Sequence, residues 1–342
     1  MVQNRFNCWL TVNRICNYRC PWCYAEGTKY RAEDSMTLEL AEKLLHFMVK
    51  VGTGSVYFIG GEPTLWPHLM EANTLAKDLG METTLVTHGA RFKDDKFFHQ
   101  VLDNPFDHIG LSIKAGNREQ HKAITGHDNF ADSLAVIRKI RDAKLKFNGS
   151  IVVNRLLADN LLECIERAMA AGLSNLGLDL CSPIIDGTDI KDTFTMSPAE
   201  SARLIEKYYD EIHRLTDGHF NIHISTPLCL WNRDLIETLK KRSQITTGCF
   251  VTNNSGLIFD PEGFLLPCNS LHQIKLGQFG TDFHDQASFE AYWNQGPPAD
   301  FNRRITTYPS ETCVACEDYD ACTGGCPLNW FALKPDAVIP AR

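Results

Sequence analysis

Residues 16–23 read Cys-Asn-Tyr-Arg-Cys-Pro-Trp-Cys, a CxxxCxxC loop directly after the apolar run 6–12, which predicts a buried strand. Active sites of parallel α/β folds lie at the carboxyl ends of such strands. Three thiolates on one short loop can hold three irons of a [4Fe–4S] cube and leave the fourth iron open to a chelating ligand. A zinc site needs a fourth ligand, and nearby choices are few, because Cys8 lies within the strand and the first histidine is His46. The stretch therefore favours an iron–sulfur site over zinc.

The composition is that of an ordinary soluble enzyme, apart from thirteen cysteines in 342 residues. A net charge of −8 argues against nucleic-acid binding. No stretch has the roughly 18 to 20 uncharged apolar residues of a membrane helix, and residues 1–15 lack the layout of a signal peptide. We therefore expect a cytoplasmic protein, in which clustered cysteines are better explained as metal ligands or reactive thiols than as disulfides.

Short apolar runs alternate with amphipathic stretches as far as about residue 215. Buried strands are predicted at Phe6–Val12, Ser55–Gly60, Glu82–His88, His108–Lys114, Phe147–Asn154 and Asn175–Ser182. Helices are predicted at Leu38–Val51, Pro67–Leu79, Phe130–Ala143, Leu161–Ala171 and Pro198–Leu215. About six βα units imply a parallel sheet covered by helices, either doubly wound or part of a (β/α) barrel.

After about residue 216 the alternation stops. One strand is expected at Asn221–Ser225 and short pieces at Gly256–Phe259 and Gly263–Leu266, in sequence rich in Gly, Asn and Cys. Such a stretch buries little apolar surface, so bound metal is expected to replace part of the missing core. We expect a barrel over 1–215, a bridging segment over 216–245 and a cysteine-rich domain over 246–342.

Two motifs together carry a family resemblance. CxxxCxxC with Trp22 before its last cysteine is followed, one βα unit later, by the strand-end run Gly60-Gly61-Glu62-Pro63. Together these resemble the radical SAM superfamily, which implies a partial (β/α)6 TIM-type barrel in which S-adenosylmethionine chelates the open iron. Glycines permit close backbone approach, and Glu62 can accept hydrogen bonds from an ammonium such as the methionine amino group. By the resemblance, the cluster ligands are Cys16, Cys20 and Cys23, and Trp22, Gly60, Gly61, Glu62 and Pro63 contact the cofactor.

Later strand ends carry weaker matches. Thr87-His88-Gly89 stands where relatives often have Thr-Asn-Gly, and Ser112 and Asn154 are candidate contacts to the cofactor's carboxylate and ribose. The alternative is that these polar groups only satisfy local backbone. Lys114 departs from the usual acid, and it is either an ion-pairing residue or a group that binds a substrate carboxylate.

The C-terminal cysteines follow the spacing CX2CX5CX3C, with two more upstream. The pattern resembles the SPASM extension of radical SAM enzymes, which binds two auxiliary clusters. The resemblance assigns the first auxiliary cluster to Cys249, Cys268 and Cys326, and the second to Cys313, Cys316 and Cys322.

The usual seventh cysteine is absent from 327–342. Three explanations stay open: the chain is truncated, the second cluster takes a non-cysteine ligand such as Asp336, or that cluster has an open iron. Cys229 is a candidate to complete the first auxiliary site or to donate a hydrogen atom, and Cys181 to act as a thiol donor at the barrel mouth. For both cysteines the alternative is simple packing.

The resemblance implies reductive cleavage of S-adenosylmethionine to a 5'-deoxyadenosyl radical that takes a hydrogen atom from the substrate. The leading hypothesis is modification of a ribosomally made precursor peptide, by cross-linking, thioether formation, excision or oxidation. Because the CxxxCxxC loop begins at residue 16, a leader-binding domain is expected to be a separate protein. The expected electron donor is a reductase such as flavodoxin or ferredoxin. The alternatives are oxidation, dehydration or epimerisation of a small metabolite such as an aminosugar, and a non-catalytic iron–sulfur electron-transfer protein.

Overall fold

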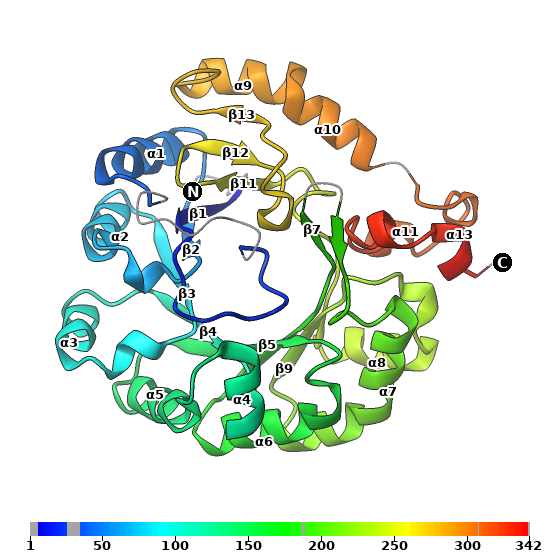
Figure 1. Cartoon of the computed structure of the whole chain (residues 1–342). Helices are drawn as coiled ribbons and strands as arrows, with labels where there is room; N and C mark the ends of the chain where they lie inside the picture. Colours follow the sequence, from blue (N-terminus) through cyan, green and yellow to red (C-terminus); the bar gives the residue numbers. More distant parts are fainter. Residues whose placement is uncertain (1–5, 26–34, 187–188, 307, 341–342) are drawn as a thin grey trace.

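A ring of parallel strands surrounded by helices forms most of the molecule (Figure 1). The structure is a computed structural model that describes residues 6–25, 35–186, 189–306 and 308–340. Within those ranges one sheet has eleven strands in the order β10-β9-β6-β5-β4-β3-β2-β1-β11-β12-β13, and β7 and β8 form a separate pair. The strands are β1 (Asn7–Asn13), β2 (Ser55–Gly60), β3 (Glu82–Thr87), β4 (His108–Ile113), β5 (Phe147–Val153), β6 (Leu176–Leu180), β7 (Ile184–Asp186), β8 (Asp189–Lys191), β9 (Phe220–His223), β10 (Ile245–Thr246), β11 (Gly256–Phe259), β12 (Phe264–Leu266) and β13 (Gly277–Gln278).

Helices α1, α2, α3, α5, α6 and α7 each connect two strands of the ring and cover its outside (Figure 1). From β11 round to β10 all neighbouring strands are parallel, whereas β12 and β13 add to the β11 edge in antiparallel fashion. The α-helices are α1 (Leu38–Lys50), α2 (Leu69–Asp78), α3 (Asp95–Asp103), α4 (Arg118–Thr125), α5 (Phe130–Asp142), α6 (Leu161–Ala170), α7 (Pro198–Leu215), α8 (Arg233–Lys241), α9 (Gln286–Gln295), α10 (Pro297–Ile305), α11 (Tyr319–Cys322), α12 (Asn329–Ala332) and α13 (Pro335–Val338).

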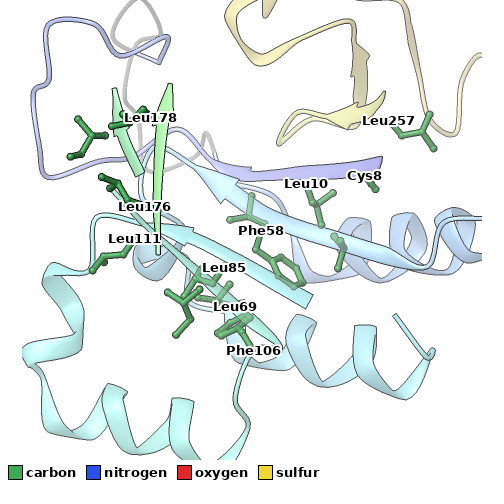
Figure 2. Close-up of a cluster of buried hydrophobic side chains, with 14 of the residues drawn as sticks. Cys8, Leu10, Phe58, Leu69, Leu85, Phe106, Leu111, Leu176, Leu178 and Leu257 are labelled. Atoms are coloured by element: carbon green, nitrogen blue, oxygen red, sulfur yellow. The ribbon is translucent and has the colours of Figure 1, made fainter. Parts of the chain in front are cut away.

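The main core lies between the outer face of the ring and the helices (Figure 2). Side chains alternate along a strand, so every second residue faces the helices. Leu10, Phe58 and Leu85 are outward-facing and fully buried. Register aligns Leu10 with Phe58 on one side and with Phe259 on the other, so these apolar side chains form a continuous layer across three strands.

The inner face of the ring is more polar and only partly buried. On β4, β5, β6 and β9 the residues between the buried apolar ones are Ser112, Ser150, Asp179 and His223. Register places Ser112 beside Ser150 and Asp179 beside His223. We call this inner face the lumen, and it offers hydrogen-bonding groups where the outer face offers hydrocarbon.

The predicted α/β fold with a partial barrel is confirmed, and each of the six predicted strands has its counterpart in β1 to β6. The alternation nevertheless continues beyond residue 216, because α7 leads into β9, which pairs with β6 in parallel. The sheet thus includes strands from all three predicted segments, 1–215, 216–245 and 246–342, and those boundaries stay a prediction. Within the described ranges, no helix is both long and apolar enough to span a membrane.

Candidate active site at the carboxyl ends of the strands

The residues singled out in the barrel sequence gather at one end of the ring. The segment after β1 lies over the centre of the ring (Figure 1). Since the strands are parallel, their carboxyl ends meet at the same edge. The residues at or just beyond the ends of β1 to β6 are Cys16, Glu62, His88, Lys114, Asn154 and Cys181.

The three thiols of the CxxxCxxC loop lie close enough to act on one another electrostatically. The pKa of Cys16 is raised to about 12, by burial first and then by the charges of Glu62, Cys23 and Cys20. The backbone N–H of Tyr18 opposes this by donating to Cys16 Sγ at 3.3 Å. Hydrogen bonds to sulfur are among the features that set the potential of a bound cluster.

A small apolar cluster holds this loop against the ring. Tyr18, Cys20, Ala115 and Ile124 are buried together, and Trp22 packs against them. The ring of Tyr18 stacks on His88 with centroids 3.9 Å apart.

Gly60 and Gly61 allow the chain after β1 to lie directly on the end of β2. A Cβ on Gly61 would lie 2.4 Å from the carbonyl oxygen of Ile15, and one on Gly60 would lie 2.6 Å from that of Asn13. The resulting contact is hydrogen-bonded, because Glu62 N–H donates to Ile15 O at 2.7 Å. Glycine is therefore needed at these two positions because the chain after β1 packs against them. This reason is separate from the close approach of a cofactor that the motif predicts.

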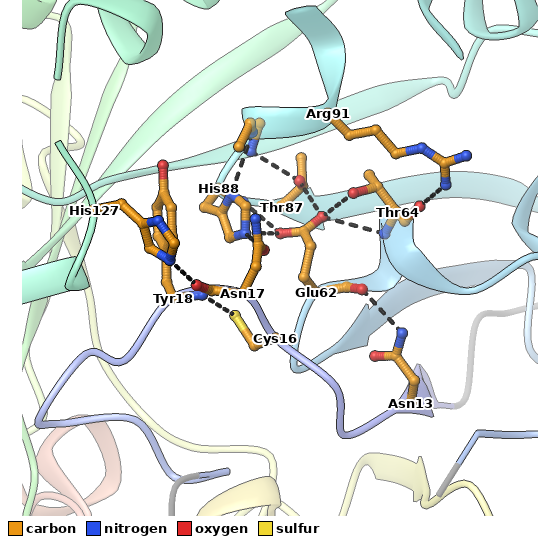
Figure 3. Close-up of polar contacts among 12 residues, drawn as sticks. Asn13, Cys16, Asn17, Tyr18, Glu62, Thr64, Thr87, His88, Arg91 and His127 are labelled. Carbon is orange, nitrogen blue, oxygen red and sulfur yellow. Dashed lines mark hydrogen bonds and ion pairs between the residues drawn. The ribbon is translucent and has the colours of Figure 1, made fainter. Parts of the chain in front are cut away.

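The carboxylate of Glu62 joins the ends of β2 and β3 (Figure 3). Oε1 accepts from the N–H and hydroxyl of Thr64 at 3.2 and 2.6 Å and from the hydroxyl of Thr87 at 2.5 Å. Oε2 accepts from the His88 backbone N–H at 3.0 Å. The side chain is fully buried, and four donors fill the roughly four acceptor positions of a carboxylate. Pro63 starts the 3-10 helix η1 (Pro63–Leu65), which brings Thr64 to this carboxylate.

His88 is a neutral imidazole with its proton on Nε2. Burial lowers its pKa, against the opposing effect of Glu62. Nδ1 accepts from the Ala90 N–H at 3.2 Å, so the proton lies on Nε2, which donates to Asn17 Oδ1 at 2.8 Å and lies 3.2 Å from Glu62 Oε2. His88 therefore links the Glu62 carboxylate to the CxxxCxxC loop. The motif Thr87-His88-Gly89 was recognised in the sequence, but this role of the histidine was not.

The other predicted cofactor contacts divide into two kinds. Asn154 bonds its own neighbourhood, with Nδ2 donating to Val152 O at 2.8 Å and Oδ1 accepting from Leu156 N–H at 2.9 Å. By contrast, Ser112 and Lys114 line a small cavity together with Tyr18, His88 and His121. A larger cleft of about 440 Å³ opens beside Asn17, Glu62 and His88.

A second polar group lies in the lumen and was not foreseen. Ser150 donates to Asp179 Oδ2 at 2.5 Å, and His223 Nδ1 lies 3.6 Å from Asp179 Oδ1. Burial acts to raise the pKa of Asp179, but interactions with His223 and Ser150 outweigh it and lower the pKa. Asp179 in turn raises the pKa of His223. A charged residue inside the apolar strand Leu-Gly-Leu-Asp-Leu is the signal by which the sequence marks this position.

The C-terminal cysteines fall into two groups by the thiols that act on one another. Cys326 lies by the carboxyl end of β6, since its N–H donates to Ser225 O at 2.8 Å and the Ser225 hydroxyl donates to Leu180 O at 3.3 Å. In the first group, the pKa of Cys326 is raised to about 12, by burial first and then by the thiols of Cys249 and Cys268. In the second, burial raises the pKa of Cys322, and Cys316 and Cys313 act in the same direction. The thiols that act on one another are those that the resemblance groups together, and their role as cluster ligands stays a prediction.

Cys229, Cys181 and Asp336 take distinct places. The thiols of the second cysteine group help to raise the pKa of Cys229, whereas the sequence offered Cys229 as a candidate ligand for the first group. Cys181 follows β6, and burial raises its pKa to about 12. Asp336 accepts from the Ser310 hydroxyl at 2.7 Å.

The donor sets suit iron–sulfur clusters. Across the described ranges, no three His, Cys, Asp or Glu side chains are grouped so as to hold a single metal ion. A cube has a different requirement, because each thiolate binds its own iron. The CxxxCxxC loop, in which Cys20 and Cys23 lie close enough to raise the pKa of Cys16, fits a cube with one iron left for another ligand.

The fold, the CxxxCxxC loop and the contacts of the Gly60–Pro63 motif together point to one class of enzyme. Residues 10–168 match the profile of the Radical SAM superfamily, so this part of the chain is a radical SAM domain.

Named relatives extend the similarity over nearly the whole chain. The chain is 25% identical over 337 residues to a PqqA peptide cyclase of Bradyrhizobium diazoefficiens, covering 96% of this chain and 83% of that protein. It is 31% identical over 209 residues to a probable GTP 3',8-cyclase of Saccharolobus solfataricus, covering 59% of this chain and 64% of that protein.

Solved structures show the same fold. Native anSMEcpe with bound AdoMet and Cp18Cys peptide superimposes with a TM-score of 0.70 at 19% identity, over 94% of this chain and 88% of that one. Streptococcus suis SuiB bound to precursor peptide SuiA gives 0.73 at 16% identity, over 98% and 76%. The chain is thus a radical SAM enzyme with homology to peptide-modifying enzymes.

Proposed function

We propose that this enzyme modifies a ribosomally made precursor peptide by abstracting a hydrogen atom from it. When bound, a reduced [4Fe–4S] cluster and S-adenosylmethionine supply a 5'-deoxyadenosyl radical, with methionine as the other cleavage product. Two auxiliary clusters held by the C-terminal cysteine groups complete the cofactor set. The single observation that carries the proposal is that the CxxxCxxC loop, the Glu62 carboxylate and the segment at Cys326 all lie at the carboxyl ends of the strands.

In this proposal the chain's own residues bind and orient. Cys16, Cys20 and Cys23 hold three irons. The cleft of about 440 Å³ beside Glu62 has the roughly 300–1,000 Å³ usual for small-molecule sites. For Glu62 to receive the methionine ammonium, one of its four present donors has to turn away, and the Thr64 hydroxyl can do so by rotating.

The lumen is the proposed place for the substrate. Ser150, Asp179 and His223 present hydrogen-bonding groups there, and Lys114 adds a positive charge at the mouth. These groups suit an amide-rich substrate, because each peptide unit offers one donor and one acceptor.

A peptide substrate is favoured over a small metabolite because the chain matches a peptide-modifying relative over more of its length than it matches a nucleotide cyclase. The match to the PqqA peptide cyclase runs over 96% of this chain and so includes the C-terminal cysteine groups. The match to the GTP 3',8-cyclase runs over 59%. In SuiB the solved complex contains a precursor peptide, in a fold that this chain shares over 98% of its length.

The test is deuterium transfer from a labelled peptide. The anaerobically reconstituted enzyme is incubated with dithionite, S-adenosylmethionine and a perdeuterated precursor peptide encoded beside its gene, with a separately produced leader-binding protein where one is encoded there. We expect deuterium in 5'-deoxyadenosine and a mass change in the peptide. The matched control, Cys16→Ala with Cys20→Ala and Cys23→Ala, is expected to give neither. Deuterium transfer from a sugar nucleotide, with none from the peptide, would overturn the substrate assignment.

A further inference from the structure

Cys229 is held in place by the residues on both sides of it. It lies in the 3-10 helix η4 (Leu228–Leu230), and its neighbours Leu228 and Trp231 are buried. Trp231 Nε1 donates to the Thr226 hydroxyl at 2.9 Å. Cys229 itself is exposed. The backbone is therefore fixed while the thiol lies outside the core.

The segment before Cys229 is docked onto the cysteine loop that ends the CX2CX5CX3C motif. Leu228 N–H donates to Cys322 Sγ at 3.3 Å, and Cys326 N–H donates to Ser225 O at 2.8 Å. Gly325, at φ +79°, permits the close approach, since a Cβ there would lie 3.0 Å from Ser225 O. The donor in each contact is a backbone N–H, and together they fix the position of Cys229 relative to Cys322.

The thiol of Cys229 interacts with one cysteine group. Its pKa is raised to about 11, by partial burial first and then by the nearby thiols of Cys322, Cys313 and Cys316. In the first group, burial and then the thiol of Cys249 raise the pKa of Cys268. Cys229 therefore belongs with the three cysteines that the sequence left without a fourth.

We propose that Cys229 is the fourth thiolate ligand of the second auxiliary cluster, completing the set of Cys313, Cys316 and Cys322. The inference rests on the proposed function, which supplies that cluster. Four cysteines are the usual ligands of a [4Fe–4S] cube. The competing ligand is Asp336, whose Oδ1 already accepts from the Ser310 hydroxyl.

The test compares cluster content in full-length variants reconstituted anaerobically with iron and sulfide. The wild type is expected to hold about twelve irons per chain, as three cubes require. Cys229→Ala is expected either to lose about four irons or to lose about one and show the electron paramagnetic resonance signal of an oxidised three-iron cluster. Cys229→Ser, which keeps the size of the side chain, is measured beside it, with circular dichroism to establish that both variants are folded.

Two control variants show whether a loss of iron is specific to Cys229. Cys164→Ala removes a buried thiol on the core side of α6, and Asp336→Asn removes the competing carboxylate. Both are expected to keep about twelve irons. Full iron content and unchanged spectra in both Cys229 variants, or loss of iron in Asp336→Asn instead, overturn the ligand assignment alone. A wild-type count of about eight that Cys313→Ala leaves unchanged refutes the second cluster of the proposed function itself.

Discussion

Replacing Glu62 with glutamine tests whether this carboxylate organises the mouth of the ring. The two side chains have nearly the same shape, but glutamine has one acceptor oxygen where glutamate has two. If that oxygen keeps the three donors on Oε1, the new NH2 group faces the His88 N–H, so a donor meets a donor in a fully buried site. Losing one hydrogen bond to a charged group and leaving a buried N–H unpaired costs about 2–4 kcal/mol.

We expect the reconstituted Glu62→Gln enzyme to melt roughly 4–8 °C below the wild type, at about 2 °C per kcal/mol for a chain of this size. Thermal unfolding followed by circular dichroism gives the melting temperature, and hydrogen exchange of the His88 amide locates the effect. The control is Glu39→Gln, on the exposed face of α1, where the carboxylate pairs with Lys43 in a solvent-exposed ion pair and little change is expected. Equal melting temperatures for Glu62→Gln and Glu39→Gln, with unchanged exchange at His88, would refute the reasoning.

Three further predictions concern other parts of the molecule. Gly61→Ala places a Cβ 2.4 Å from a backbone oxygen, so we expect a loss of about 3 kcal/mol or more in denaturant unfolding, whereas Gly177→Ala, which meets nothing closer than 3.7 Å, should stay well below that loss. The pKa of His223 is raised by its aspartate partner, so its contribution is complete below the unfolded pKa of about 6.5 and fades as pH rises through the folded pKa. The melting-temperature gap between wild type and His223→Gln should therefore be larger at pH 6 than at pH 8.5, and a gap that grows with pH would contradict this. Cys313→Ala with Cys316→Ala should still release 5'-deoxyadenosine by chromatography but yield no modified peptide, and full peptide turnover would count against a role for that cluster.

Much of the fold follows from the sequence because buried parallel strands and their covering helices have strong patterns. The runs at Ser55–Gly60 and Pro198–Leu215 are predicted with the bounds that the structure has. Short elements such as α4 lie outside the prediction, because their apolar stripe is brief. The continuation of the sheet into β9 was missed as part of the ring, since four residues give little periodicity to read.

The candidate site, like the fold, has a part that the sequence predicts and a part that it does not. Spacing alone identifies CxxxCxxC and the Gly60–Pro63 motif, because their members are close in sequence. Contacts between distant segments leave no such trace, and the pairing of His88 with Asn17 and the docking of Ser225 onto Cys326 are of this kind. Cys229 lies 84 residues before Cys313, and only the fold brings the two together.

The most direct test of the account is whether S-adenosylmethionine binds the cluster of the CxxxCxxC loop. Electron paramagnetic resonance spectra of the dithionite-reduced protein are recorded with and without S-adenosylmethionine. A double variant in the C-terminal cysteines, Cys313→Ala with Cys268→Ala, isolates the signal of the first cluster. We predict that adding S-adenosylmethionine changes the spectrum of that cluster. A reduced cluster whose spectrum stays the same at saturating S-adenosylmethionine would contradict the open iron on which the whole account depends.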